Sequence, residues 1–355
     1  MNILICSNGN LHQLLIYAKS FSKQGHNVVF LNPVWKNPLY PYDEQLEKYN
    51  IRFYTYDEFY QHMFLYGWNE HEGYDFDVIF SPNHSAVTYA FEIKNRLDIP
   101  VLQQILDIPT ELFSWKNIGE GYKIKHKPFM DLYPKMDALT GINKCVPGQI
   151  EELCGRKDCH YIPYPIDTEL FDNGIDYPVS LGDKIDVVFC ISRLEPYKGV
   201  DILIEACHDI FGLNLKVAGY GSMFDDLYNM TLRKKTLCSF MKTIDDSQKD
   251  FWLKKSKVVI YPQTWSQAPG IVSQEALYCH TVPVCFAYDS QKDLDGNFGI
   301  YAELPPSADG LRVAIEKALH VVDNFNYQKS HDYVKYNLSG DVVSEKILTV
   351  LKGLV

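Results

Sequence analysis

Short apolar runs and helix-spaced apolar positions alternate along the first half of the chain. Residues 1–6 (MNILIC) are predicted as a buried strand, and apolar residues then recur at helical spacing from Leu11 to Phe21, ending near Gly25. A strand at 28–31 completes a strand–helix–strand opening, which is typical of a doubly wound α/β domain. Its first turn lacks a GxGxxG motif, which argues against a nicotinamide or flavin site. Further strands are predicted at 51–54, 77–80, 100–105 and 138–142.

The same alternation restarts after a polar, turn-rich stretch at 172–184 (DNGIDYPVSLGDK), which reads as a linker. Strands are predicted at 186–191, 215–218, 236–240, 258–261 and 282–286, with a turn at 241–245, and helices at 200–211, 246–256, from 271, at 310–322 and at 341–354. We therefore expect two Rossmann-like doubly wound domains facing a central cleft. Their expected bounds are 1–172 and 184–338, with a C-terminal helix at 339–355 that packs back on the first domain.

Length and composition agree with a two-domain globular protein. The chain has 355 residues, 46% of them hydrophobic and 22% charged. The N-terminus has no basic region typical of a signal peptide, and no apolar run is long enough for a membrane-spanning helix. Nine cysteines without a CxxC pair indicate reduced thiols. The expected location is the cytoplasm.

The net charge of −11 argues against nucleic acid as a partner, because a phosphate backbone needs a broad basic surface. An anionic ligand would instead need a few locally concentrated cations. Residues 115–135 are rich in lysines and aromatic residues. One interpretation is a surface that meets an acceptor or an anionic membrane; the other is a solvated loop and helix.

The stretch 263–285 (QTWSQAPGIVSQEALYCHTVPVC) places a loop and a helix N-terminus after an apolar strand. Ligands of open α/β sheets bind at that edge, and a helix N-terminus favours anions. Glu275 can accept hydrogen bonds from two vicinal hydroxyls, and Gln267 can donate to and accept from a sugar hydroxyl. The backbone amides of Gly270–Val272 can face a phosphate or a hydroxyl. The alternative is an ordinary helix whose Glu275 faces solvent.

Arg193 and Lys198 follow a predicted strand in CISRLEPYKGVDIL. Two cations at the end of a strand suit a diphosphate, the alternative being surface ion pairs such as one with Glu195. Gly219-Tyr220-Gly221, after the next strand, allows close backbone approach to a ligand or forms a simple turn. The histidines and cysteines form no metal-binding motif, so no metal site is expected.

Several segments together resemble the retaining GT-B glycosyltransferases, specifically glycosyltransferase family 4. In the second half these are SRLEPYKG with Arg193 and Lys198, GYG at 219–221, and QAPGIVSQEAL at 267–277. In the first half, IPYPIDTELF at 162–171 resembles the segment that closes the family's N-terminal domain, and the SNGN turn with Gly9 resembles its first glycine loop.

The resemblance implies a GT-B fold with the donor held mainly by the second domain and no essential metal or other cofactor. Arg193 and Lys198 would stabilise the leaving diphosphate. Glu275 matches the second acid of the family's E-x7-E motif and would bind the donor ribose. Gly9, Gly219 and Tyr220 would also line the donor, the Gly270, Ile271 and Val272 backbone would meet its sugar or phosphate, and Met241 and Lys242 match the turn that contacts the nucleobase.

Three positions depart from the family pattern. Gln267 stands where the first acid of the motif is usual, so it is the candidate third catalytic residue and puts the donor preference in question. Leu106-Asp107 replaces a frequent His-Asp pair, and His84 or Asp107 is expected to line the acceptor side instead. His280 stands in place of a glycine in CHTVPV.

The resemblance implies a retaining glycosyltransferase that moves a hexose from a UDP- or GDP-linked donor to a hydroxyl of a glycan or another acceptor. Two other functions remain open. One is a catalytically weak nucleotide-sugar binding module, suggested by Gln267 and Leu106. The other is a sugar-nucleotide epimerase on the same architecture, which would convert the sugar without net release of the nucleotide.

Overall fold

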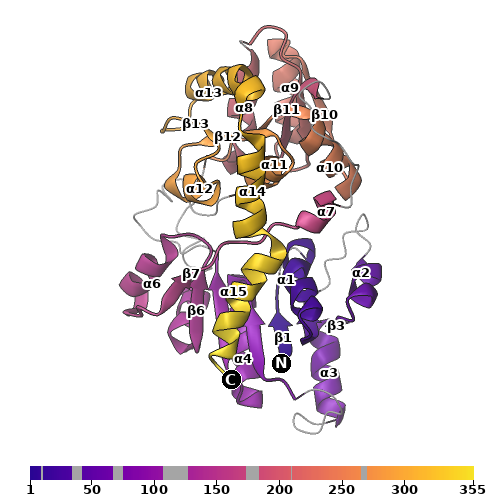
Figure 1. Ribbon diagram of the computed structural model, residues 1–355, viewed down its shortest axis with the longest axis vertical. Helices are drawn as coiled ribbons and strands as arrows, with labels where there is room; N and C mark the ends of the chain where they lie inside the picture. Colours follow the sequence, from indigo (N-terminus) through magenta and orange to yellow (C-terminus); the bar gives the residue numbers. More distant parts are fainter. Residues whose placement is uncertain are drawn as a thin grey trace. The chain divides into compact units, whose positions relative to one another are not determined.

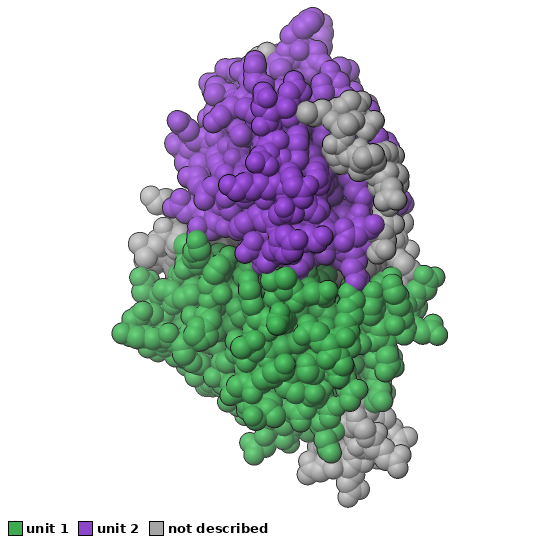
Figure 2. All heavy atoms as spheres, viewed as in Figure 1, with its two compact units in different colours: residues 1–165, 340–355 green, residues 166–339 purple. Residues whose placement is uncertain are grey.

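The computed structural model describes residues 1–8, 11–33, 42–66, 75–106, 127–172, 184–208, 210–264 and 270–355. These residues divide into two compact units, coloured separately in Figure 2. The first unit is Met1–Pro165 with Gly340–Val355, and the second is Ile166–Ser339. The boundary between Pro165 and Ile166 lies before residues 172–184, which are predicted from the sequence to be a linker.

The first unit is built on a parallel seven-stranded sheet. Its strands follow the order β3-β2-β1-β4-β5-β6-β7. Strands β1, β4 and β5 are apolar or uncharged runs buried almost throughout, as expected where helices cover both faces of a parallel sheet. The bounds are β1 Asn2–Cys6, β2 Asn27–Leu31, β3 Arg52–Tyr54, β4 Val78–Ser81, β5 Val101–Ile105, β6 Ala138–Gly141 and β7 Cys159–Tyr161.

Helices pack on both faces of this sheet and form two hydrophobic cores. The last helix of the chain belongs to one of them: Val343, Ile347 and Leu351 pack with Leu14 and Tyr17 of the first helix. The Ser20 hydroxyl also donates to Asp341, at 2.7 Å. The helices are α1 Leu11–Lys23, α2 Tyr42–Lys48, α3 Tyr56–Tyr66, α4 Val87–Leu97, α6 Val146–Cys154 and α15 Gly340–Lys352 (Figure 1).

The second unit is built on a parallel six-stranded sheet in the order β10-β9-β8-β11-β12-β13. The order reverses between β8 and β11, as it does between β1 and β4 in the first unit. Both units are therefore doubly wound. The bounds are β8 Ile185–Ile191, β9 Leu215–Ala218, β10 Cys238–Met241, β11 Ser256–Tyr261, β12 Val282–Phe286 and β13 Ile300–Ala302.

Helices again cover both faces of the second sheet. One face carries α8, α9 and α13, and the other carries α7, α10, α11 and α14 (Figure 1). No helix in the part of the chain that the structure describes has the length and hydropathy needed to cross a membrane. The bounds are α7 Thr168–Asp172, α8 Val200–His208, α9 Phe224–Lys234, α10 Asp246–Lys255, α11 Val272–Tyr278, α12 Asp289–Leu294, α13 Ala308–Val321 and α14 Tyr327–Leu338.

The predicted strands of the second unit agree with the structure within a few residues, except that Met241 ends β10 instead of opening a turn. Several helices have no counterpart in the sequence-based prediction, and in the second unit these are α7, α9, α12 and α14. In α14 only Ser330, Val334 and Leu338 are buried, and α9 buries Leu227 while leaving Leu232 exposed. Such narrow buried stripes give a weak helical period, which explains why the pattern of apolar residues did not predict them.

Replacing Ile347 with alanine should destabilise the first unit. The side chain is fully buried against α1, so the change removes apolar contacts and leaves a cavity, at a cost of about 2–5 kcal/mol. Chemical denaturation would give the free energy of unfolding, and hydrogen exchange would locate the loss in β1 and α1. The control Glu345→Ala changes an exposed side chain of the same helix and should cost under about 0.5 kcal/mol. Equal losses in both variants would contradict the packing of α15 on α1.

Candidate functional site

The reversal of strand order between β8 and β11 marks the expected ligand position in the second unit. In open α/β sheets, ligands bind outside the carboxyl ends of the strands at this switch point. Lys198 follows β8, and Gln263 follows β11. The Lys198 ammonium donates to Gln263 Oε1 at 2.5 Å and lies 3.5 Å from the Tyr261 hydroxyl, which also donates to Gln263. The two strand ends are therefore joined through a lysine.

Arg193 lies beside this lysine. Its guanidinium donates to the Tyr197 hydroxyl at 2.7 Å, and both cations lie over the Tyr197 ring, at 5.8 Å for Arg193 and 5.4 Å for Lys198. Cations are attracted to the negative face of an aromatic ring. Tyr197 thus holds two positive charges close together at the carboxyl edge of the sheet.

Neither cation forms an ion pair with a carboxylate in the described residues. The expected alternative, a pair with Glu195, is not what the structure shows, because the Glu195 carboxylate accepts from the Ser222 amide and hydroxyl at 3.2 and 2.7 Å. Burial, and to a smaller extent the charge of Arg193, lower the pKa of Lys198 from 10.5 to about 8. An anion at this position would offset both effects.

Lys184 shows what a buried structural lysine looks like in the same sheet. It lies just before β8, at the opposite end of the strand, and burial lowers its pKa to about 8 as well. Its ammonium donates to the carbonyls of Lys254 and Ser256 and to the Thr281 hydroxyl, at 2.8–3.1 Å. These bonds use all three N–H donors of the Lys184 ammonium, so Lys184 stabilises the fold and has no donor left for a ligand. Lys198 makes one short bond, to the Gln263 amide oxygen, and a long one to the Tyr261 hydroxyl.

Two glycines allow the turns around the lysine to approach other backbone closely. Gly199 has φ +65°, and a Cβ there would lie 2.2 Å from the Pro262 carbonyl oxygen. Gly219 has φ +142°, and a Cβ there would lie 1.8 Å from the Ser192 carbonyl oxygen. Larger residues cannot occupy these positions without moving the backbone.

The other predicted nucleotide-binding residues adjoin Gly219. Its amide lies 3.0 and 3.1 Å from the carbonyl oxygens of Met241 and Lys242, so the ends of β9 and β10 meet there. The Tyr220 side chain is 66% exposed and is therefore accessible to a ligand. The structure thus brings Arg193, Lys198, Gly219, Tyr220, Met241 and Lys242 to the same edge of the sheet.

Gly270 is fixed by a buried polar network behind α11. Its amide donates to Gln291 Oε1 at 3.1 Å, and a Cβ at Gly270 would overlap the Tyr261 ring. Of the predicted amides at 270–272, the Gly270 amide is thus bonded to the chain, and ligand contacts of the Ile271 and Val272 amides stay a prediction.

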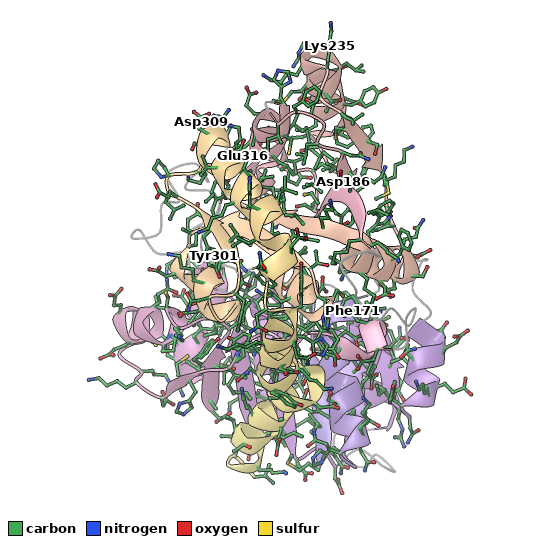
Figure 3. All side chains as sticks on the ribbon, turned by 45° about the horizontal axis from the view of Figure 1, so that its top comes forward. Phe171, Asp186, Lys235, Tyr301, Asp309 and Glu316 are labelled. Carbon is green, nitrogen blue, oxygen red and sulfur yellow. The ribbon has the colours of Figure 1, made fainter. Side chains whose placement is uncertain are left out.

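Asp295 lies at the centre of this network. Its carboxylate accepts from Ser273 at 2.8 Å, from Gln291 at 3.1 Å and from Gln274. It also bonds Tyr301 of β13, which is labelled in Figure 3. The residue is fully buried, and burial raises its pKa from 3.8 to about 7 against the opposing effect of these donors.

Glu275 is buried on α11, not facing solvent. Its side chain is 4% exposed, and Oε1 accepts from the Lys249 ammonium of α10 at 2.6 Å. Burial raises the pKa of the Glu275 carboxyl, and Lys249 offsets part of that rise. One carboxylate oxygen of Glu275 is thus bonded to Lys249, and the contact of Glu275 with two vicinal hydroxyls stays a prediction.

His84 lies after β4, at the switch point of the first sheet. Burial lowers its pKa to about 4, so the imidazole is neutral at physiological pH. Uncharged groups surround this strand end: the Asn83 side chain donates to the Asn8 carbonyl at 2.9 Å, and Ser85 donates to the same carbonyl at 2.6 Å. The described groups bonded next to His84 therefore offer hydrogen bonds without charge.

Three predicted site residues, Gly9, Asp107 and Gln267, lie outside the described residues. Residues 115–126 of the lysine- and aromatic-rich segment lie outside them as well. Among the described residues, no group of three or more His, Cys, Asp or Glu side chains is placed to hold a metal ion.

The sequence did not single out several residues that shape this site. Tyr197 precedes Lys198, and Tyr261 and Gln263 lie at the end of β11. Their position at the ends of the two switch-point strands is the sequence feature by which they could have been predicted. Lys249 and Asp295 gave no such signal, because each meets its partners only through tertiary packing.

Replacing Asp295 with asparagine should remove a pH dependence of stability. Because the folded-state pKa is raised from 3.8 to about 7, the protonated acid is favoured in the fold, and stability is lost as pH rises through that window. The loss is up to roughly 4 kcal/mol. Asp295→Asn stays neutral and should give a flatter profile in denaturation measured from acid to neutral pH.

The matched control is Asp309→Asn, an exposed acid on α13 labelled in Figure 3. It should leave the profile of the unsubstituted chain unchanged. If Asp295→Asn follows the same profile as this control, the burial of a proton-binding carboxyl at Asp295 is refuted.

Comparison with known proteins agrees with this geometry. Residues 178–337 match the family model described as glycosyl transferases group 1. No curated protein matches the chain. Among solved structures, Anabaena HepE in complex with UDP and glucose is 15% identical with a TM-score of 0.78, each chain covered in full.

Two further structures are similar over nearly their whole length. A glycosyltransferase from Rickettsia africae is 13% identical with a TM-score of 0.76, and sucrose-phosphate synthase from Thermosynechococcus elongatus is 13% identical with a TM-score of 0.75. In both cases the match covers 99% of this chain and 98% of the other. The chain therefore has the two-domain GT-B fold, and its residues 178–337 match the group 1 glycosyltransferases.

Proposed function

We propose that the protein is a retaining glycosyltransferase that moves a hexose from a UDP- or GDP-linked donor to an acceptor hydroxyl. The observation that carries this proposal is the pair of cations at the β8–β11 switch point. Arg193 and Lys198 share the Tyr197 ring and have no carboxylate partner among the described residues. Two adjacent uncompensated cations favour a ligand with two negative charges, such as a nucleoside diphosphate.

The chemical role of this pair follows from charge. In sugar transfer, the bond between the anomeric carbon and the diphosphate oxygen breaks, and negative charge builds up on the leaving diphosphate. Cations that are already in place stabilise this charge without reorganising, and a partly desolvated lysine interacts more strongly than an exposed one. Lys198 and Arg193 are therefore the proposed catalytic residues, with Gln267 as a proposed contact to the donor sugar.

The remaining donor contacts follow the same edge of the sheet. Gly219 and Tyr220 adjoin the diphosphate position, and the Met241 and Lys242 backbone beside them suits the nucleobase. Ile271 and Val272 are proposed to meet the sugar or phosphate, and Glu275 the ribose, with Gly270 in the turn before α11. Gly9 is kept as a further proposed donor contact. Anabaena HepE, with the same fold, has structures in complex with UDP and with UDP-glucose, which supports a uridine diphosphate donor here.

The acceptor is proposed to bind at the carboxyl edge of the first sheet, with His84 and Asp107 among its contacts. The described groups bonded next to His84, from Asn83, Ser85 and Asn8, are uncharged, which suits a glycan or another polyol. The neutral His84 has no acidic proton to give as a general acid, and the retaining step needs no separate protein base if the departing phosphate removes the acceptor proton.

Replacing Lys198 should lower donor use and change its pH dependence. Lys198→Ala removes one of the two cations and should lower kcat/KM for UDP-glucose roughly 100-fold or more. In the unsubstituted chain, Lys198 loses its charge as pH rises past about 8, so UDP-glucose affinity should weaken there. Lys198→Arg stays charged and should abolish that weakening in calorimetric titrations across this range.

Lys184→Met is the matched control, because Lys184 is equally buried with the same lowered pKa but bonds only to the chain. It should lower the melting temperature while leaving UDP-glucose affinity unchanged. If Lys198→Ala transfers sugar at the unsubstituted rate, or if both lysine variants lose affinity alike, the proposed diphosphate site is wrong.

A further inference from the structure

Three exposed apolar side chains lie at the amino ends of β9 and β10. Phe211 is fully exposed, and Leu232 and Leu237 are 59% and 62% exposed. They belong to the turn before β9, to the last turn of α9 and to the residues just before β10. We call these two segments, 210–213 and 232–237, the amino-end tip. Single exposed apolar residues are common, but several at one end of a domain mark a surface that contacts another molecule.

The pairing of β9 with β10 brings the two segments of the tip together. Leu215 lies opposite Cys238 in the parallel register, and its amide donates to the Leu237 carbonyl at 3.0 Å. The two strands therefore begin at the same level of the sheet. The end of α9 is also tied to α8, because the Lys234 ammonium pairs with Glu205 at 2.8 Å. The tip is thus one continuous part of the surface.

The tip is basic in a chain whose net charge is −11. Arg233, Lys234 and Lys235 follow one another at the end of α9, and neither segment contains Asp or Glu. Asp209, which precedes the first segment, lies outside the described residues. Among the described residues, neither Arg233 nor Lys235 pairs with a carboxylate. The Lys235 side chain extends outward at the end of α9 (Figure 3). An acidic surface would complement this charge.

Two simpler explanations account for only part of the tip. The helix dipole favours cations at the carboxyl end of α9, but it gives no reason for the exposed apolar side chains beside them. A second copy of the chain would cover those side chains, but in a symmetric pair the patch meets itself, so Arg233 and Lys235 would face the same cations. A stable protein interface also takes about 20–30 residues from each side, more than the two segments contain.

We propose that the amino-end tip docks on a lipid membrane with anionic headgroups. Phe211, Leu232 and Leu237 enter the boundary between headgroups and acyl chains, where an apolar side chain leaves water without needing a complementary protein surface. Arg233 and Lys235 contact the negative headgroups. The proposed donor site lies at the carboxyl ends of the same strands, so docking at their amino ends leaves it open. This inference does not depend on the proposed sugar transfer.

Flotation with lipid vesicles tests this docking. The unsubstituted chain should bind vesicles that mix phosphatidylcholine with phosphatidylglycerol at least about tenfold more tightly than vesicles of phosphatidylcholine alone, because each cation near an anionic surface adds to the affinity. Added NaCl should weaken binding to the mixed vesicles, because it screens the charges. Absence of binding to the mixed vesicles, or equal binding to both kinds, would overturn the proposal.

Variants of the tip separate its apolar and its charged contributions. Phe211→Ala should lower the affinity for the mixed vesicles about tenfold, and so should the double variant Arg233→Gln/Lys235→Gln. All three side chains are exposed, so the melting temperature should stay that of the unsubstituted chain. If both variants bind the mixed vesicles like the unsubstituted chain, the contact with lipid lies elsewhere and the proposal is wrong.

The matched control is the double variant Val313→Ala/Lys317→Gln on α13. Val313 is 61% exposed, and Lys317 is exposed one turn further along the same helix. The change removes an apolar side chain and a cation from the second unit outside the tip, so vesicle binding should be unchanged. Equal losses in the control and in the tip variants would contradict a specific docking surface.

Two further measurements distinguish the other outcomes. Sedimentation without lipid should give the same mass for Phe211→Ala and for the unsubstituted chain. A dimer that Phe211→Ala dissociates would show that a second copy covers the tip, and would overturn the membrane proposal. Calorimetry with UDP-glucose tests the donor site separately: its failure would remove the proposed function and leave the docking of the tip to be decided by the vesicles.

Discussion

The candidate site depends on a lysine, Lys198, that is kept partly desolvated beside Arg193, with no carboxylate paired to either cation in the part of the chain that the structure describes. The fall in the Lys198 pKa from 10.5 to about 8 corresponds to roughly 3 kcal/mol of unfavourable charge burial. An ion pair on the solvent-exposed surface contributes at most about 1 kcal/mol, so an exposed lysine would bind an anion less strongly than the buried Lys198. A bound diphosphate would offset this unfavourable free energy, because its negative charge stabilises the charged form of Lys198.

The rest of the second unit can be understood as support for that arrangement. Gly199 lets the turn that carries Lys198 reach the backbone after β11, and the Tyr261 ring lies between the lysine and Gly270. Behind Gly270, Gln291 and Asp295 fix the start of α11. A displacement of the end of β11 or of the start of α11 would therefore move the Tyr261 and Gln263 groups that contact Lys198.

The fold could be predicted from the sequence because buried parallel strands are continuous apolar runs and the helices between them are amphipathic. Among the elements that the prediction missed are α9 and α14, whose buried stripes are narrow, and the short strands β7 and β13, of three residues each. Arg193, Lys198 and Glu275 could be chosen because they follow strands or lie early in a helix after one. The partners Lys249, Gln291 and Asp295 could not be chosen, since each is far from its contacts in the sequence.

The burial of Glu275 is the feature that most changes the interpretation of the stretch 263–285. From sequence, its carboxylate offers two equivalent oxygens at the start of a helix. In the fold, desolvation raises the free energy of the ionised carboxylate. The Lys249 ammonium of α10 offsets part of this rise through its hydrogen bond to Oε1. Tertiary packing has thus made the two oxygens chemically different, which local sequence cannot reveal.

A crystal structure of the protein with UDP-glucose bound tests the central claim most directly. The account predicts the diphosphate at the β8–β11 switch point, within hydrogen-bond distance of both Lys198 and Arg193, and in place of any carboxylate partner. A diphosphate bound elsewhere, with Lys198 still held only by Gln263 and Tyr261, would contradict it.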